Sequence, residues 1–354
     1  MLGRVPLLPN HLTKNTEGRR SRRRRNGIYV DFGAWYDDGS SSAFTLNNAD
    51  DLAGLSLLVN SGNNFSGKTI TLTANLDLSA YADWETIGYR TQFAGTFDGG
   101  GKTIANLINK SKFYDSIVGL FGIIGTGGVV KNLILEDVGI YNPWYIIGGV
   151  AGVNYGTVSN CHAKGSVENG GSGNNDSTGG VVGTNNSTVE NCYSTSTVTG
   201  NSEIGGVVGT VASMCTVENC YSTGSVTGIS SVGGVNGIEL GTVENCMALN
   251  PSITRSSGGD TNFGRVIGER EWYPSNNNYA YEDMEFYDGA TLQAGFPSPD
   301  KTDTGKDGAD LSGTDAKTAV ANWPTPFQSA PWVWNGAAGL PSLSGVGTVQ
   351  AWPF

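Results

Sequence analysis

The sequence predicts an all-β protein built around a single-stranded parallel β-helix, a solenoid of stacked coils. Three observations predict this fold class. A pattern rich in Gly and Val recurs between residues 118 and 253. One Asn, which we call the anchor Asn, recurs at the same position of each repeat. The spacings are 28, 31, 28 and 26 residues between Asn132, Asn160, Asn191, Asn219 and Asn245. Glycine supplies 53 of the 354 residues, which disfavours helices because each interior Gly costs about 1 kcal/mol relative to Ala.

Each repeat contains three short β-prone pieces, such as 205–209, 216–222 and 225–227, separated by Gly, Asn and Ser. Three strands per unit indicate one triangular coil, which buries its apolar face only by stacking on neighbours about 4.8 Å away. A β-propeller is the main alternative, but its blades need about 40–45 residues. Strict alternation would separate Val217 from Cys220, so we expect a left-handed bend at Asn219 and an amide ladder along the stack.

The segments that flank the repeats are expected to close the solenoid. A capping helix is predicted over about residues 48–60, with an Asn cap, early acidic residues and a closing Gly62. The tail is rich in Trp, Tyr and Phe and is expected to form a C-terminal cap, with an exposed loop over residues 297–315. The predicted organisation is a basic N-terminal arm and linker over 1–42, the β-helix over 43–270 and the C-terminal cap over 271–354.

The net charge of −11 is unevenly distributed, because residues 1–25 carry +7 and the remainder carries −18. The acidic body argues against nucleic-acid binding by the folded part, since phosphate contacts need Lys and Arg. Any such contact is expected only through a basic docking arm, which comprises Arg19, Arg20, Arg22, Arg23, Arg24 and Arg25. No apolar run reaches the roughly 18–20 residues of a membrane-spanning helix, and we recognise no signal peptide in the first residues.

Three stretches resemble the GLUG-repeat family of bacterial surface proteins: GKTITLTANLDLSAYADWETIGY, FAGTFDGGGKTIANLIN and the GGVVG…TVENCYSTGSV units. The resemblance covers roughly residues 43–260. It implies a right-handed parallel β-helix with an adhesive or structural role in secreted or surface-attached proteins, and it supplies no catalytic motif. The Arg-rich leader and the lack of a recognisable secretion signal depart from the family pattern.

A row of carboxylates is the first candidate site. Glu190, Glu218 and Glu244 occupy equivalent positions in successive repeats, so stacking puts them about 5 Å apart. Retaining glycosidases use a similar separation, and like-charged neighbours raise a carboxyl pKa. The row could equally hold Ca²⁺. The favoured interpretation is a solvated outer face, where water and salt screen the repulsion.

Aromatic and acidic residues near the C-terminus form two further candidates. Trp332 and Trp334 either stack on sugar rings or help to seal the end of the solenoid. A run of acidic residues, which comprises Asp300, Asp303, Asp307 and Asp310, lacks the pattern of an EF-hand, so a polar loop is favoured over a calcium site.

Four cysteines, each following an anchor Asn, predict a file of reduced core thiols: Cys161, Cys192, Cys220 and Cys246. A zinc site would need the sulfurs to converge, which a linear file does not allow, and disulfides between coils are the lesser alternative. Cys215 has no assigned role. His162 follows Cys161 and aligns with Tyr193, Tyr221 and Met247, so a stacked row is favoured over a Cys–His dyad.

These observations favour a non-enzymatic structural or adhesive protein on a cell or particle surface, with a protein or carbohydrate partner and no cofactor. Two alternatives remain open. One is a virion decoration or fibre protein docked by the basic arm, which could also mediate homo-oligomer assembly. The other is a polysaccharide lyase or glycoside hydrolase that uses a groove of the β-helix.

Overall fold

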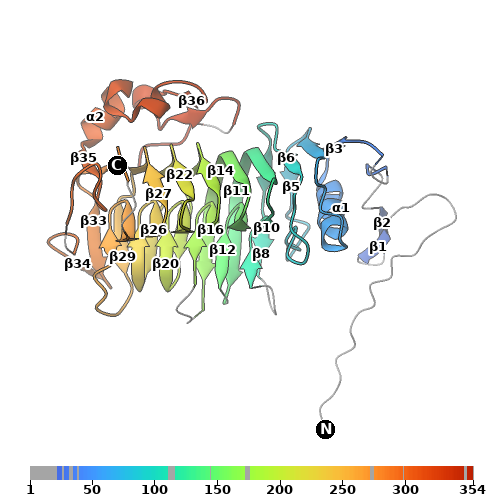
Figure 1. Ribbon diagram of the computed structural model, residues 1–354, viewed down its shortest axis with the longest axis horizontal. Coiled ribbons are helices and arrows are strands. Elements are labelled where there is room, and N and C mark those ends of the chain that lie inside the picture. Colours follow the sequence, from blue (N-terminus) through green and yellow to red (C-terminus); the bar gives the residue numbers. More distant parts are fainter. Residues whose placement is uncertain are drawn as a thin grey trace, which may run out of the picture.

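The computed structural model describes residues 22–25, 28–31, 35–37, 40–110, 116–143, 145–171, 176–271, 275–297, 299–346 and 349–353. Within these ranges the chain forms a parallel β-solenoid of about nine turns, as predicted (Figure 1). Each middle coil contributes strands to three parallel sheets, because turns at Gly and Asn interrupt the strands at the same places in every coil.

Two of the three sheets have six strands each. The first consists of β9 (Ile117–Val118), β12 (Ile146–Gly148), β15 (Thr178–Gly179), β20 (Ser202–Gly205), β25 (Ser230–Gly233) and β30 (Phe263–Gly264). The second consists of β10 (Phe121–Ile124), β13 (Ala151–Asn154), β16 (Val182–Asn185), β21 (Val208–Val211), β26 (Asn236–Glu239) and β31 (Ile267–Arg270).

The third sheet contains three stacks of short strands, which the long strands β11 (Val129–Asn142) and β14 (Thr157–Asn169) join. Its first stack also contains β3 (Ala43–Leu46), β4 (Thr69–Leu72), β6 (Thr96–Asp98), β17 (Thr188–Glu190), β22 (Thr216–Glu218) and β27 (Thr242–Glu244). The middle stack adds β5 (Leu76–Asp77), β7 (Thr103–Ala105), β18 (Tyr193–Ser194), β23 (Tyr221–Ser222), β28 (Met247–Ala248), β32 (Tyr279–Tyr281) and β35 (Ala309–Leu311). The last adds β8 (Ile108–Asn109), β19 (Thr197–Thr199), β24 (Val226–Gly228), β29 (Ser252–Arg255) and β33 (Glu285–Asp288).

Three pairs of strands in the described part of the chain are antiparallel. β34 (Thr291–Leu292) folds back on β33, and β1 (Arg22–Arg25) pairs with β2 (Ile28–Asp31). The third pair, β36 (Trp332–Val333) and β37 (Ser342–Leu343), belongs to the C-terminal segment.

The predicted bend at the anchor asparagines is confirmed. Asn132, Asn160, Asn191, Asn219 and Asn245 have φ angles between 51° and 56°, in the left-handed region that Asn tolerates better than other non-Gly residues. The amide ladder exists in pairs. Asn160 Nδ2 donates to Asn132 Oδ1 at 3.1 Å, and Asn219 Nδ2 donates to Asn191 Oδ1 at 3.3 Å.

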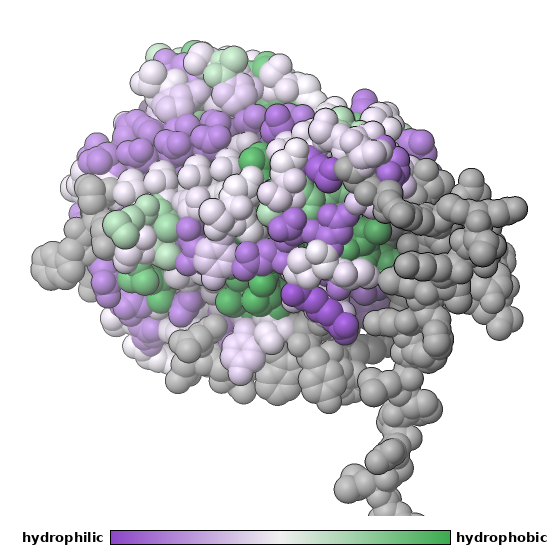
Figure 2. All heavy atoms as spheres, turned by 45° about the vertical axis from the view of Figure 1, so that its right-hand side comes forward, coloured by the Kyte–Doolittle hydropathy of each residue, from purple (hydrophilic) through white to green (hydrophobic). Residues whose placement is uncertain are grey.

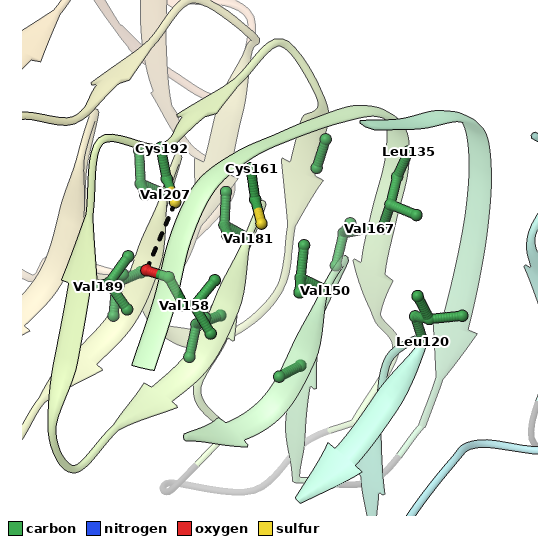
Figure 3. Packing of buried hydrophobic residues seen from close by; sticks show 14 of the residues in the cluster. Leu120, Leu135, Val150, Val158, Cys161, Val167, Val181, Val189, Cys192 and Val207 are labelled. Carbon is green, nitrogen blue, oxygen red and sulfur yellow. Dashed lines mark hydrogen bonds between the residues drawn. The ribbon is translucent and has the colours of Figure 1, made fainter. Parts of the chain in front are cut away.

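The core is filled by inward-facing rows of Val, Leu, Ile, Phe and Cys. Figure 3 shows part of it, with labelled Val, Leu and Cys side chains. Val158, Val189 and Val217 align in consecutive coils and have no exposed surface. Glycines allow the coils to approach this closely. A side chain on Gly206 would collide with the carbonyl oxygen of Gly234 in the next coil.

The helical N-terminal cap is confirmed as α1 (Ala49–Asn60), which lies at the N-terminal end of the solenoid (Figure 1). The Asn48 side chain caps it by accepting a hydrogen bond from the Asp51 N–H at 2.9 Å. Leu52, Leu55 and Val59 have no exposed surface, because this face of the helix covers the open core of the first coil.

The C-terminal end of the solenoid is closed by a residue that departs from the repeat. Arg265 occupies the place of Gly206 and Gly234, which is free for a side chain because no full coil follows. The buried guanidinium of Arg265 pairs with Asp310 at 2.6 Å, and the backbone N–H of Arg265 donates to Asp307 Oδ1 at 2.9 Å. The expectation of an exposed loop over 297–315 is therefore wrong at Asp307, which is 1% exposed.

The aromatic C-terminal segment lies along the side of the solenoid instead of across its end (Figure 1). We call residues 312–346 the clasp. It contains α2 (Gly313–Thr318), three 3-10 turns (Val320–Asn322, Thr325–Gln328 and Gly336–Ala338), β36 and β37. It packs on a row of large outward-facing side chains of the middle stack, which includes Ile134, Tyr193, Tyr221 and Met247. These apolar side chains need cover, and an end cap could not reach them.

Candidate functional site

The predicted carboxylate row is formed. Glu190 aligns with Glu218, and Glu218 with Glu244, at the ends of β17, β22 and β27. A parallel row of Thr188, Thr216 and Thr242 lies two residues earlier, on the same outer face. All six side chains are half-buried. Figure 2 shows hydrophilic side chains gathered in a band that runs along the solenoid beside the clasp.

The glutamates perturb one another, as the spacing predicted. Burial raises the pKa of Glu218, and repulsion from Glu190 and Glu244 raises it further. Burial also raises the pKa of Glu190. The row therefore holds protons more readily than isolated surface carboxyls do, and it can both donate and accept hydrogen bonds along one line.

Among the described residues, no further metal ligand joins the carboxylates of the row. In the part of the chain that the structure describes, no group of three or more His, Cys, Asp or Glu side chains is placed to hold a metal ion. The row continues toward the N-terminus through Ser159, Lys131 and Asp98, and Lys131 pairs with Asp98 at 3.4 Å. The carboxylates of this row without a paired cation are thus Glu190, Glu218 and Glu244, in three consecutive coils.

The thiol file lies in the core, beneath the carboxylate row. Cys161, Cys192, Cys220 and Cys246 are free and fully buried, and each Sγ donates to the carbonyl two residues earlier at 3.1–3.2 Å. Burial raises the pKa of Cys161 and Cys220, which keeps these thiols protonated and unreactive. Cys215 is free and half-buried in the loop between β21 and β22.

The predicted row through His162 is confirmed. The His162 ring stacks on Tyr193 with centroids 4.0 Å apart, and Tyr193 stacks on Tyr221 at 4.8 Å. Met247 follows Tyr221 in register. Burial, reinforced by the charge of Lys164, lowers the pKa of His162 to about 3, so the imidazole is neutral near pH 7.

Trp332 and Trp334 lie in the clasp. Trp332 is 4% exposed and packs on Tyr221 with ring centroids 5.5 Å apart, so its indole offers no open face for a sugar ring. Trp334 is half-buried against Trp323 and Trp352. Both residues therefore belong to the apolar packing of the clasp and not to the exposed outer rows of the solenoid.

The basic arm lies partly outside the described residues. Arg19 and Arg20 fall outside them, whereas the backbone of Arg22, Arg23, Arg24 and Arg25 forms β1. The acidic run near the C-terminus does not converge. Asp307 and Asp310 bind Arg265, and Asp303 is exposed.

Glu239 is a buried ionisable group that was not expected from the sequence. Glu239 is fully buried, pairs with Arg270 at 3.2 Å and contacts Ser275. Burial raises the pKa of Glu239 to about 7. A signal was present, because Glu239 stands where the preceding coils carry Asn154, Asn185 and Val211, and a charge at a position otherwise held by amides or an apolar residue marks a special position.

Helices play little part in the described structure, and none of those it contains has the length and apolar character needed to cross a membrane.

Comparison with known proteins links this geometry to one type of repeat. The family model described as the GLUG motif matches residues 145–168, 174–199 and 200–227. These segments correspond to consecutive coils.

Two curated proteins are similar in sequence. One is a "Putative Gly-rich membrane protein" of Evansella cellulosilytica, 36% identical over 156 residues, which cover 42% of this chain and 18% of the relative. The other is "Halomucin" of Haloquadratum walsbyi, 34% identical over 124 residues, which cover 35% of this chain and 1% of the relative. The chain thus spans only a small part of the relatives it matches.

A solved structure has the same fold. It is titled a "putative immunoglobulin A1 protease from Bacteroides ovatus", and it superposes with a TM-score of 0.67 over 86% of this chain and 93% of its own. At 19% identity this likeness concerns the fold alone. Together with the motif matches, it confirms the resemblance inferred from the sequence: this chain is a parallel β-solenoid that carries GLUG repeats.

Proposed function

We propose that this chain is a rigid, non-enzymatic structural or adhesive module displayed at a surface, with a protein or carbohydrate partner. The observation that carries the proposal is the in-register repetition of outward side chains, such as Thr188, Thr216 and Thr242. Such a row presents the same group at intervals of about 4.8 Å, which suits many weak contacts to a repetitive partner.

The sequence relatives support this setting. One is named a "Putative Gly-rich membrane protein" and the other "Halomucin", and the matched segment is a minor part of each. A solenoid segment of this kind serves well as a spacer or display unit within a larger surface assembly, because each coil is hydrogen-bonded to its neighbours along its length.

Surface display is tested on intact cells that produce the protein. If the proposal is right, an added protease or antibody reaches the chain before lysis, to the same extent as a known surface marker. A chain that stays protected until the cells are broken open would contradict the proposal.

Adhesion is tested by retention of the purified chain on three immobilised probes: a mucin glycoprotein, alginate and cellulose. Combined Thr188→Ala, Thr216→Ala and Thr242→Ala changes should cut retention on the recognised probe by about tenfold or more, because avidity multiplies small losses. A matched control is the row of Thr199, Thr227 and Thr254 on the last stack, changed to Ala together. Background-level retention on all three probes would refute the adhesive role and leave the structural one.

An enzymatic role is the second candidate, supported by the neighbouring Glu190 and Glu218 with raised pKa values. If the pair acts as acid and nucleophile, the chain cleaves at least one polysaccharide of an acidic and neutral panel, and Glu218→Gln lowers that rate by orders of magnitude. The exposed Glu168 supplies the control change Glu168→Gln. Unchanged substrate in every reaction would reject this candidate.

A further inference from the structure

The clasp carries almost no charge. After Lys317 the sequence contains no ionisable side chain up to residue 354, although the whole chain has 53 charged residues (21 Lys and Arg, 32 Asp and Glu). Trp323, Phe327, Trp332, Leu340, Leu343 and Val346 of this segment are buried in one apolar cluster with the outward row of the middle stack. A neutral, apolar cover therefore lies over coils whose other outer faces are polar.

The covered row contains a single group that titrates near neutral pH when free in water, His162. His162 lies in register between Ile134 and Tyr193, which both belong to the cluster beneath the clasp. The imidazole has no exposed surface. Its Nε2 is 3.2 Å from Thr195 Oγ1, and its Nδ1 is buried without a hydrogen-bond partner among the described residues.

Among the described residues, burial and the charge of Lys164 both disfavour a proton on this imidazole, and no carboxylate offsets them at His162 itself. The clasp offers no carboxylate over the row, and its only charged residues, Asp315 and Lys317, lie in α2 at its start. On the solenoid, Lys164 acts on His162 with a charge of the same sign, and Tyr193 is neutral. Glu136 acts on Tyr193 from β11. The environment therefore opposes an imidazolium as long as the clasp is closed.

We propose that the clasp is an acid-sensitive strap, which leaves the solenoid when His162 takes up a proton. Opening exposes the outward-facing His162 side chain, because its neighbours in the row, Ile134 and Tyr193, belong to the cluster that the clasp covers. The imidazole then regains its ordinary pKa near 6.5, whereas burial holds the pKa near 3 in the closed form. Between these values the open form binds one more proton, so its population rises about tenfold for each pH unit lost.

The sign of this effect separates His162 from the other perturbed groups. Glu190, Glu218, Glu203 and Glu239 have raised pKa values, so the folded state binds their protons more tightly and acid stabilises it. Asp98 and Asp310 have lowered pKa values, so they stabilise the folded state when ionised. This contribution to stability is lost only below about pH 4. If the docking of the clasp weakens between pH 6 and 4.5, the cause is therefore protonation of the His162 imidazole.

Hydrogen exchange of the full chain, followed by mass spectrometry at pH 7.5, 6.0, 5.25 and 4.5, measures the opening directly. Exchange rates of peptides from residues 323–343 are divided by the rates of unstructured peptides at the same pH. We expect the opening constant of the clasp to rise about 25-fold from pH 6.0 to 4.5, and that of peptides from residues 204–211 to stay within about threefold.

Three variants decide the cause. His162→Tyr places in the row the residue found in the next two coils, and His162→Gln gives a second non-titrating side chain in case the first misfolds. Either variant should abolish the rise, whereas His11→Gln, which removes the other histidine, should keep it. The proposal is overturned by a constant clasp opening in the natural chain, by the same rise in both His162 variants, or by opening of the solenoid together with the clasp.

Discussion

At the scale of single residues, the coil corners depend on side chains that tolerate an unusual backbone. The anchor Asn residues adopt left-handed φ angles and pair their amides between some neighbouring coils. A residue with a larger or less polar side chain would have to bear the strain of this conformation without the amide bond. The repeated Asn is thus a backbone requirement of the fold and not a ligand-binding feature.

We expect Asn219→Ala to destabilise the protein by about 1–2 kcal/mol, because it combines a left-handed backbone with the loss of the bond to Asn191. Asn219→Gly should cost less, since Gly adopts the same φ without strain. Thermal unfolding followed by circular dichroism measures both. Equal melting temperatures for the two variants would show that the backbone conformation is not the limiting factor.

Glu239 gives the solenoid a pH dependence of its own. Burial raises its folded-state pKa from about 4.5 to about 7, so its contribution to stability is fully present below pH 4.5 and is lost as pH rises through 7. We expect the natural chain to be less stable at pH 8 than at pH 5.5, by up to about 2 kcal/mol from this group. Glu239→Gln should remove that part of the difference, and the exposed control Glu282→Gln should leave it in place.

At the scale of secondary-structure elements, the distance between coils is set by glycine. In the close-packed rows a Cβ would meet the backbone of the next coil, so Gly206 and Gly234 have no room for a side chain. The last coil lifts this restriction, and Arg265 uses the free space to close the core with Asp307 and Asp310. The same position of the repeat therefore serves as a spacer inside the stack and as a plug at its end.

We expect Gly206→Ala to cost about 2 kcal/mol or more, since the new methyl group would collide with the Gly234 carbonyl and with Ser222. Gly259 is the matched control, because a Cβ there meets no atom within 4 Å. Gly259→Ala should shift the midpoint of urea unfolding only slightly. Similar losses for both substitutions would argue that chain flexibility, and not coil spacing, explains the glycine content.

At the scale of the whole molecule, the clasp connects parts of the solenoid that do not touch one another. Its apolar cluster runs from Ile134 to Leu311, and the carbonyl of Gly345 lies against Gly101. Coils of a solenoid otherwise contact only their neighbours. By spanning several coils, the clasp should make the opening of the middle coils more cooperative.

We expect Trp332→Ala to destabilise the docked clasp by about 3 kcal/mol, because it removes the ring that packs against Tyr193, Tyr221 and Phe327. Tyr221→Phe should have a smaller effect, of about 1 kcal/mol, from the lost hydrogen bond to the Pro341 carbonyl. Hydrogen exchange of the clasp at pH 7.5 reports both. Unchanged exchange in Trp332→Ala would mean that the cluster does not hold the clasp in place.

The sequence by itself determined the solenoid, its register and the rows along it, including the Glu row, the thiol file and the His162 row. It could do so because these features repeat in the chain and arise between neighbouring coils. Only the tertiary structure decided where the non-repeating parts lie: Arg265 closes the last coil, and the aromatic segment covers the side of the solenoid. Their positions depend on contacts between residues far apart in the chain. Such contacts do not repeat, so they produce no periodic pattern in the sequence.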